Sequence, residues 1–187
     1  LKLTCRLVAT PAKRFMTIYD FNNNLLRSTT SMMAGILGGA DFLCNLPYDE
    51  NYKKSHEFSQ GLAQNQLFML EYEALKKINA SVCDGAYYIE SISYGIAEKV
   101  LALFKDIERS GGWLKSIQKG TIQRKIKESH HNAEYELRDK KKIVVDINQF
   151  QDPNQLMLDQ IELYPFQKTK PRKTIVAPIV ERSLTQK

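Results

Sequence analysis

The 187-residue sequence predicts an α/β fold in which a parallel sheet is covered by helices. Short β-prone runs alternate three times with longer segments whose apolar residues recur at helical spacing. Pairs of glycines follow two of these helical segments, and glycine is the residue that most often ends a helix. The composition, 43% hydrophobic and 26% charged, is that of an ordinary globular domain with a core.

The first strand and helix lie before residue 40. Residues 1–10 are β-prone and end at a Thr-Pro break, where a strand is expected to stop. Asp20 and the Asn22–Asn24 run then supply side chains that cap the start of a helix. The helix ends at Gly38-Gly39, which lacks the G-x-G-x-x-G context of a phosphate-binding loop. Its apolar residues are Leu25, Leu26, Met32, Met33 and Ile36.

The second strand is predicted over Asp41–Leu46, and Pro47–Glu50 forms the acidic turn after it. The second helix is predicted over residues 55–77 because its apolar residues recur on one face. These residues are Phe58, Leu62, Met69 and Leu70.

The third strand is predicted near Ala86–Ile89, and the third helix over Ser93–Arg109. Gly111-Gly112 ends this helix. The apolar residues at helical spacing are Ile96, Val100, Phe104 and Ile107.

The chain divides into three parts, which are residues 1–112, 113–150 and 151–187. The first part holds the three strand–helix units. The second is a helical extension with a short strand, in which Trp113 is expected to pack in the turn between helices beside Ile117 and Ile122. The third is an extended tail, because its prolines exclude one continuous helix. These prolines are Pro153, Pro165, Pro171 and Pro178.

Three strand–helix units do not make a complete domain. A three-stranded parallel sheet must be buried on both faces and leaves two open edges, whereas a closed (β/α)8 barrel uses eight such units. The sequence also begins directly in a predicted strand at Leu1, without an initiator Met. We therefore expect this chain to be a piece of a larger protein.

The net charge of +6 and the pI near 9.1 raise the question of nucleic-acid binding. Basic residues concentrate in Lys119–Lys142 and Lys168–Lys187, but the first segment also carries four acidic residues. Pairs such as Glu136 and Lys140 have the spacing of a solvated, salt-bridged helix face. Because no nucleic-acid-binding motif accompanies the charge, nucleic acid is not an expected partner. A basic interaction module is the weaker alternative.

The apolar runs are too short for a membrane segment. Ile143–Ile147, among the longest, is far below the roughly 20 residues that a membrane helix needs. The first residues alternate apolar with polar or basic ones and do not form the apolar core of a signal peptide. We therefore expect a cytoplasmic protein without a membrane partner.

The cysteines and histidines do not predict a metal site. Cys5, Cys44 and Cys83 are odd in number, far apart and without Cys-x-x-Cys spacing, so reduced and mostly buried thiols are expected. His130-His131 are adjacent on a predicted helix and point in different directions, so solvent exposure is expected.

Five segments of the sequence carry a resemblance to a known family. In order, they are YDFNNNLLRSTTSMMAGILGGADFL, YDE, EFSQGLAQNQLFMLEYE, DGAYYIES and LFKDIERSGGWLKSIQKGTIQRKIKES. Together they resemble the last three units of the substrate barrel of the methylmalonyl-CoA mutase family. The ending ELYPFQKTKPRKTIVAPIVERSLTQK resembles the tail of the small, or beta, subunit of bacterial two-subunit mutases. The resemblance implies that residues 1–112 are the C-terminal part of a (β/α)8 TIM-type barrel.

Several positions depart from the pattern of the catalytic chains. Their Gln-Asp-Pro-Tyr-Asn-Asn corresponds here to residues 19–24, of which Asp20, Asn23 and Asn24 match. Their Ser-Leu-His-Thr-Asn at a strand end corresponds to residues 42–46, where Cys44 replaces the histidine. Their Asp-Pro-Trp-Gly-Gly-Ser-Tyr corresponds to residues 81–87, where only Gly85 and Tyr87 match.

The resemblance implies a radical rearrangement between methylmalonyl-CoA and succinyl-CoA, with adenosylcobalamin as cofactor. Asp49-Glu50 matches an acidic pair of the family, and its glutamate is expected to face the adenosyl part of the cofactor. An exposed turn carboxylate without that role is the competing interpretation of Glu50. The Asp-x-His-x-x-Gly motif of the family's cobalamin-binding domain does not occur in these 187 residues.

Apolar replacements at a strand end cannot hydrogen-bond a substrate carboxylate or carbonyl. The expected function is therefore that of a non-catalytic small subunit, or a fragment of one, that stabilises a catalytic large subunit. No catalytic residue, metal ligand or cofactor is expected for this chain alone, and acyl-CoA is expected only in the complete heterodimer. The alternative is that the complete parent chain is a catalytically active acyl-CoA mutase.

Overall fold

The computed structural model describes residues 5–20, 22–74, 83–152, 161–163 and 174–179. These residues belong to two compact units, which we treat separately. The described part of the first unit lies within residues 5–74 and 144–163, and that of the second within residues 83–143 and 174–179.

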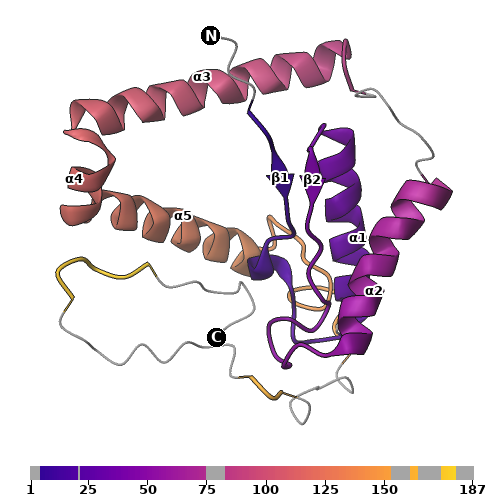
Figure 1. Ribbon diagram of the computed structural model, residues 1–187. Helices are drawn as coiled ribbons and strands as arrows, with labels where there is room; N and C mark the ends of the chain where they lie inside the picture. The colour runs from indigo at the N-terminus through magenta and orange to yellow at the C-terminus, as the bar shows by residue number, and fades with distance from the viewer. Residues whose placement is uncertain (1–4, 21, 75–82, 153–160, 164–173, 180–187) are drawn as a thin grey trace. The chain divides into compact units, whose positions relative to one another are not determined.

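The first unit contains a parallel strand–helix–strand arrangement (Figure 1). Strand β1 (Val8–Ala9) pairs in parallel with β2 (Phe42–Leu43), with Val8 opposite Phe42. Helix α1 (Asn22–Leu37) connects the two strands and follows the short 3-10 helix η1 (Lys13–Phe15). The predicted helix end is confirmed, because Gly39 has a φ of 74° in the left-handed region. The first two predicted strands are therefore confirmed as parallel, although each is shorter than expected.

Helix α1 packs against the sheet through a face that is only partly apolar. Its buried residues are Asn24, Ser28 and Met32, whereas the predicted core residues Leu26 and Met33 are exposed. One turn beyond Met32, a Cβ placed on Gly35 would lie 3.0 Å from Ala9 Cβ and 3.2 Å from Leu43 Cδ2. A glycine at this position therefore allows the helix to approach both strands closely.

Helix α2 (Glu57–Phe68) continues into the π-helix η2 (Met69–Ala74), and residues 75–77 of the predicted helix lie outside the described residues. The face that α2 buries consists of Ser59, Ala63 and Gln66, and Leu70 extends it into η2. The prediction that Phe58 and Met69 belong to the core is wrong, since both are exposed. The buried face contacts α1 through polar side chains, which hydrophobic periodicity does not detect.

The second unit consists of helices in its described part. Helix α3 (Tyr87–Arg109) is followed by α4 (Gly112–Gln118) and α5 (Thr121–Arg138), and consecutive helices contact each other (Figure 1). The predicted strand at Ala86–Ile89 is wrong, because α3 begins at Tyr87 with Ala86 as its N-cap residue. Gly85, with a φ of 79°, makes the turn into the helix, and Ile89 continues the helical apolar spacing toward the N-terminus.

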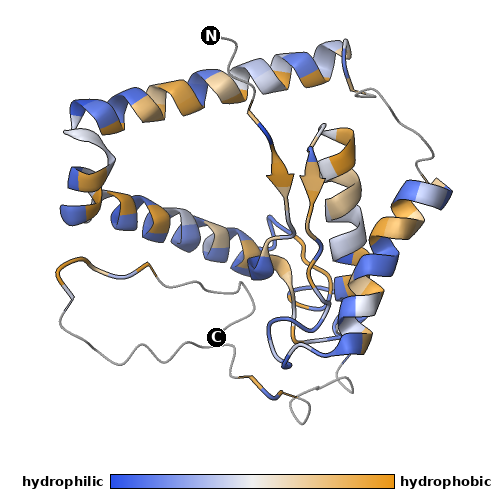
Figure 2. Cartoon of the chain, in the orientation of Figure 1, coloured by the Kyte–Doolittle hydropathy of each residue, from blue (hydrophilic) through white to orange (hydrophobic). Residues whose placement is uncertain are grey.

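Helix α3 carries a long apolar stripe that the chain leaves exposed. None of its 23 residues is buried, and Figure 2 shows hydrophobic segments along the helix. Trp113 at the start of α4 is also exposed, so the expectation that it packs in a turn between helices is wrong. The stripe residues are Ile89, Ile92, Ile96, Val100, Leu103 and Phe104. A continuous apolar surface of this kind is typical of a face that another structure covers.

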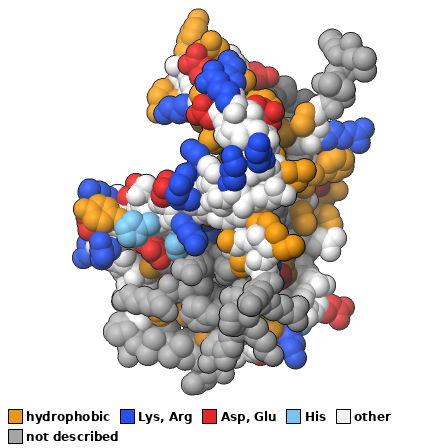
Figure 3. Space-filling view, turned by 90° about the vertical axis from the view of Figure 1, so that its left-hand side faces the viewer, with side chains coloured by type: hydrophobic (Ala, Val, Ile, Leu, Met, Phe, Trp, Pro, Cys, Tyr) orange, Lys and Arg blue, Asp and Glu red, His pale blue; other side chains and the backbone are white. Residues whose placement is uncertain are grey.

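The charged residues around α5 form local contacts. Arg124 lies 4.0 Å from Glu128, and Arg138 and Lys141 lie over the ring of Tyr135. The space-filling view of Figure 3 shows Lys and Arg side chains mixed with Asp and Glu side chains. The expected pair of Glu136 and Lys140 is absent among the ion pairs of the described residues. The helix ends at Arg138, and Lys140 adopts a φ of 56°, which breaks the helical spacing.

The segment after α5 contains a bridge between Val145 and Gln149 and no longer strand in its described part. The predicted extended tail lies largely outside the described residues. Its described pieces contact their own units, because Tyr52 O accepts hydrogen bonds from the N–H groups of Glu162 and Leu163. In the second unit, Ala177 O accepts a hydrogen bond from Gln123 Nε2 at 3.1 Å.

The three cysteines are free thiols, as predicted, but not mostly buried. Cys5 and Cys44 are exposed and Cys83 is half-buried. Cys44 follows the short strand β2, where the chain leaves the sheet and enters a loop. No described helix is both long enough and apolar enough to cross a membrane.

We predict that Gly35→Val destabilises the first unit by about 1–3 kcal/mol, because the added methyl groups collide with Ala9 and Leu43. The matched control is Gly61→Val in α2, where no heavy atom lies within 4 Å of the position of the added Cβ. Gly61→Val should change the free energy of unfolding by less than about 0.5 kcal/mol. Urea unfolding of both variants checks this, and equal effects would contradict the close approach of α1 to the sheet.

Candidate functional site

The loops that follow β1 and β2 form the candidate site. Ligands of parallel α/β proteins usually bind at the carboxyl ends of the strands. We use the name rim for residues 10–20 and 44–56, together with the first turns of α1. The rim contains the family-matched residues Asp20, Asn23, Asn24, Asp49 and Glu50.

Asn24 is the centre of the hydrogen-bond network in the rim. Its side chain is fully buried, and its Oδ1 accepts a hydrogen bond from Thr17 N at 2.9 Å. Its Nδ2 donates to Thr17 O at 2.8 Å and to Tyr48 O at 3.0 Å. One amide therefore joins the loop after β1, the start of α1 and the turn after β2.

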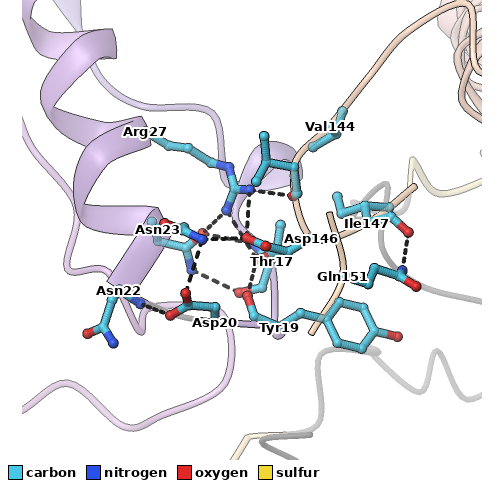
Figure 4. Close-up of polar contacts among 12 residues, drawn as sticks. Thr17, Tyr19, Asp20, Asn22, Asn23, Arg27, Val144, Asp146, Ile147 and Gln151 are labelled. Carbon is cyan, nitrogen blue, oxygen red and sulfur yellow. Dashed lines mark hydrogen bonds and ion pairs between the residues drawn. The ribbon is translucent and has the colours of Figure 1, made fainter. Parts of the chain in front are cut away.

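Asn23 lies one residue earlier and contacts two carboxylates (Figure 4). Its Nδ2 donates to Asp20 Oδ2 at 3.1 Å and to Asp146 Oδ2 at 2.5 Å. Asp20 also accepts from the backbone N–H of Asn22 and has a φ of 33°. The family-matched residues Asp20, Asn23 and Asn24 therefore serve contacts within the chain.

Arg27 is the cation of this network, and the sequence analysis did not single it out. Its Nη1 donates to Asn24 Oδ1 at 2.9 Å and to Thr17 Oγ1 at 3.1 Å. Its Nη2 donates to Val145 O at 2.7 Å and lies 3.6 Å from Asp146 Oδ2 (Figure 4). Burial lowers the pKa of Arg27, and the charges of Asp146 and Asp20 act in the opposite direction. The guanidinium is therefore held between fixed acceptors.

Asp49 and His56 form a second contact within the rim. Asp49 is 1% exposed, and its Oδ2 lies 3.0 Å from Nε2 of His56, which is the N-cap residue of α2. Nδ1 of His56 accepts a hydrogen bond from Ser59 N, so the proton of the neutral ring lies on Nε2 and faces Asp49. Both ring nitrogens thus have a contact within the chain, and the Nδ1 contact gives His56 a structural role as the cap of α2.

The two rim tyrosines are affected by the same carboxylate. Burial raises the pKa of Tyr52, and the charge of Asp49 raises it further. Burial and Asp49 also raise the pKa of Tyr48. Both phenols therefore stay protonated well into the alkaline range, and neither is a base near neutral pH.

Glu50 is the residue for which the family resemblance implies a cofactor contact. Its Oε1 lies 3.0 Å from Lys13 Nζ, and the carboxylate is half-buried. The expectation of an exposed turn carboxylate is therefore wrong, because η1 brings Lys13 over the turn. A contact between Glu50 and a cofactor stays a prediction.

Asn45, just after β2, contacts α2 through its side-chain amide. Asn45 Nδ2 donates to Ala63 O and to Gln66 Oε1, each at 2.9 Å. Gln66 Nε2 in turn donates to three acceptors on α1, which are Leu25 O, Ser28 Oγ and Thr29 Oγ1. The polar groups near this strand end therefore hold α1 and α2 together.

The described residues contain no group of three or more His, Cys, Asp or Glu side chains that could hold a metal ion. His130 is half-buried and lies 3.0 Å from Glu134, so the expected exposure holds for His131 alone of the two histidines. The site residues described above thus connect loops and helices of their own unit.

Comparisons with known proteins agree with the resemblance. The model of a family described as methylmalonyl-CoA mutase matches residues 2–181. The methylmalonyl-CoA mutase small subunit of Porphyromonas gingivalis is 32% identical over 149 residues, which are 79% of this chain and 24% of that protein. The methylmalonyl-CoA mutase large subunit of the same organism is 26% identical over 148 residues, which are 79% of this chain and 21% of that protein.

The methylmalonyl-CoA mutase of Escherichia coli is 27% identical over 148 residues, which are 79% of this chain and 21% of that protein. The chain therefore spans about a quarter or less of the length of these relatives.

We predict that Asn24→Asp destabilises the first unit by about 2–4 kcal/mol. The substitution keeps the shape of the side chain but turns a donor toward Thr17 O and Tyr48 O into a buried acceptor. The same change at exposed Asn22, at the start of α1, is the matched control and should cost less than about 0.5 kcal/mol. Chemical denaturation measures both, and a similar effect at the two positions would refute the central role of Asn24.

A further prediction concerns His56. His56→Ala should destabilise the unit by about 2–3 kcal/mol, because α2 loses its cap and buried Asp49 loses a partner. His56→Ser, which restores only the cap, should recover about 1 kcal/mol of that loss. Thermal and urea unfolding check the order of the variants. The control is His131→Ala at an exposed position on α5, where a small effect is expected. If His56→Ala had an effect as small as that of the control, the proposed structural role of His56 would be ruled out.

Proposed function

Because this chain belongs to the methylmalonyl-CoA mutase family, we propose that it is part of the non-catalytic small subunit of a two-subunit mutase. In this proposal, the chain stabilises a catalytic large subunit that interconverts methylmalonyl-CoA and succinyl-CoA. The higher identity to a small subunit, 32%, than to the large subunit of the same organism, 26%, supports the assignment.

The observation that carries the proposal is the internal use of the rim side chains. A radical rearrangement requires fixed donors that hold the substrate and exclude water from the intermediate. In this chain Asn24 and Arg27 donate to acceptors of the chain itself, and His56 has both ring nitrogens engaged. These contacts support a role in which the rim preserves a shape instead of holding a substrate.

The rim also fits adenosylcobalamin poorly. The family as a whole implies this cofactor, and Glu50 is the residue that would face its adenosyl part by family position. Glu50 Oε1 lies 3.0 Å from Lys13 Nζ, so a cofactor contact of this carboxylate would compete with the ion pair. We therefore assign cofactor binding mainly to the catalytic subunit and derive no step of the reaction in this chain.

The apolar stripe of α3 supports a role in assembly. The six large side chains of the stripe lie exposed on one face of the helix, and a soluble protein rarely leaves such a face uncovered. Coverage by other parts of the mutase, including the large subunit, would remove this surface from water.

The second candidate function is an enzymatic one, in which the complete parent protein turns over an acyl-CoA. Two matches favour this alternative, because the chain is also similar to the large subunit of Porphyromonas gingivalis and to the mutase of Escherichia coli. The weaker alternative, a basic interaction module, has less support, because the charged side chains of α5 form local contacts such as the one between Arg124 and Glu128.

The proposal is tested by producing the chain alone, the large subunit alone and the two together. We expect no succinyl-CoA formation by the chain with added adenosylcobalamin and methylmalonyl-CoA. We also expect co-purification with the large subunit and a higher Tm of that subunit in the mixture, because binding stabilises the folded state. Cofactor-dependent turnover by the chain alone would instead favour the enzymatic alternative.

A matched pair of variants addresses the interface. Ile96→Asp places a charge within the stripe of α3 and should weaken co-purification at least tenfold. Glu98→Ala, on the same helix and about 160° away from Ile96 around its axis, should leave co-purification unchanged. Equal retention of the two variants would exclude the stripe from the interface and leave other surfaces to be tested.

A further inference from the structure

The carboxylate of Asp146 is seated against two donor side chains of α1. Asn23 Nδ2 donates to Asp146 Oδ2 at 2.5 Å, and Arg27 Nη2 lies 3.6 Å from the same oxygen (Figure 4). Asp146 is 8% exposed, although it is 123 positions away from Asn23 in the sequence. A distant segment therefore places one carboxylate in a largely buried position at the start of α1.

The backbone around Asp146 is specialised for this placement. Asp146 has a φ of 66°, a left-handed conformation that glycine adopts without strain and most other residues avoid. The turn is closed by a hydrogen bond from Asp146 N to Gln149 O and by one from Val144 N to Asn148 Oδ1. Arg27 further binds the turn through Val145 O. A glycine would adopt this backbone conformation without strain, yet the residue at this position is an aspartate.

The donors on α1 are oriented by contacts that do not involve Asp146. Arg27 Nη1 is held by Asn24 Oδ1 and Thr17 Oγ1, and Asn23 Nδ2 also donates to Asp20 Oδ2. Removal of the Asp146 carboxylate would therefore leave a preorganised guanidinium and amide. This pair of groups suits a carboxylate, because both present N–H donors and the guanidinium supplies the opposite charge.

We propose that Asn23 and Arg27 form a carboxylate-binding cradle and that Asp146 is an internal ligand that fills it. The cradle takes small carboxylates as a chemical class, and in this chain the Asp146 side chain excludes external ones. The inference concerns this chain's own residues and does not depend on the proposed mutase function. Asp20 Oδ2 accepts a hydrogen bond from Asn23 Nδ2 at 3.1 Å and thus places a second negative charge beside the cradle.

The experiment is chemical rescue of Asp146→Gly in the full chain. Glycine relaxes the backbone at this φ and leaves space for acetate, which is the removed side chain as a free molecule. We expect the Tm of Asp146→Gly to be lower than that of the unaltered chain. Acetate should raise it saturably by roughly 2–5 °C over sodium chloride of equal ionic strength. If this variant is unfolded in chloride, the same titration is measured as recovery of the helical circular dichroism.

Three controls separate a site from a general salt effect. The unaltered chain should not respond to acetate, because Asp146 fills the cradle. Asp146→Asn also lacks the charge but keeps the volume, so it should not respond either. Asp146→Gly combined with Arg27→Gln should lose the response, because the guanidinium is absent.

Absence of a saturable response in Asp146→Gly would overturn the proposal. An equal response of the unaltered chain or of the double variant would overturn it as well, because it would show an effect of acetate that is independent of the cradle. Neither result depends on mutase activity, so failure here is distinct from failure of the proposed function.

Discussion

The first unit depends on one buried amide. Asn24 lies on the first turn of α1 and hydrogen-bonds to both backbone groups of Thr17 and to the carbonyl of Tyr48. The loops after β1 and β2 are too irregular to satisfy these backbone groups with each other, and leaving them buried without partners would be costly. The same side chain accepts from Arg27, whose second nitrogen reaches Val145. The position of the 144–149 turn therefore also follows from the placement of Asn24.

The sequence allowed the order β1–α1–β2–α2 to be predicted, because these elements have distinct periodicities and a glycine stop separates α1 from β2. The prediction of a third strand near Ala86–Ile89 was wrong for a local reason. Tyr87, Tyr88 and Ile89 are β-prone, but Ile89 also fits the apolar spacing of α3, which begins at Tyr87 and includes all three residues. Hydrophobic spacing predicts Met32 and Leu70 of the buried faces correctly, but not Ser28 and Gln66. These two residues are polar, and hydrophobic spacing does not register a face packed through hydrogen bonds.

The sequence predicts only those parts of the candidate site that show a recognisable pattern among neighbouring residues. The sequence predicts Asp49 and Glu50 as an acidic turn after a strand, but it does not predict their partners His56 and Lys13. His56 caps α2 although histidine is not among the residues that N-cap preferences single out. The contact between Arg27 and Asp146 had no local signal, because 119 positions separate them in the numbering and each residue alone resembles an ordinary surface charge.

A protein can keep the geometry of a ligand-binding rim without its chemistry if the polar side chains are paired with one another. A site without such pairing has a free-energy cost when its ligand is absent, because a desolvated guanidinium that could bind an anion is then left unneutralised. In this chain Asp146 supplies that neutralisation from within, and the side-chain amide of Asn45 donates to Ala63 O and Gln66 Oε1 of α2. These polar groups are thereby paired within the chain itself. The stripe of α3 differs from the rim, because its six apolar side chains are exposed and no described residue buries them. Burial of that stripe would release water from apolar surface, which gives association a driving force that the internally paired rim does not provide.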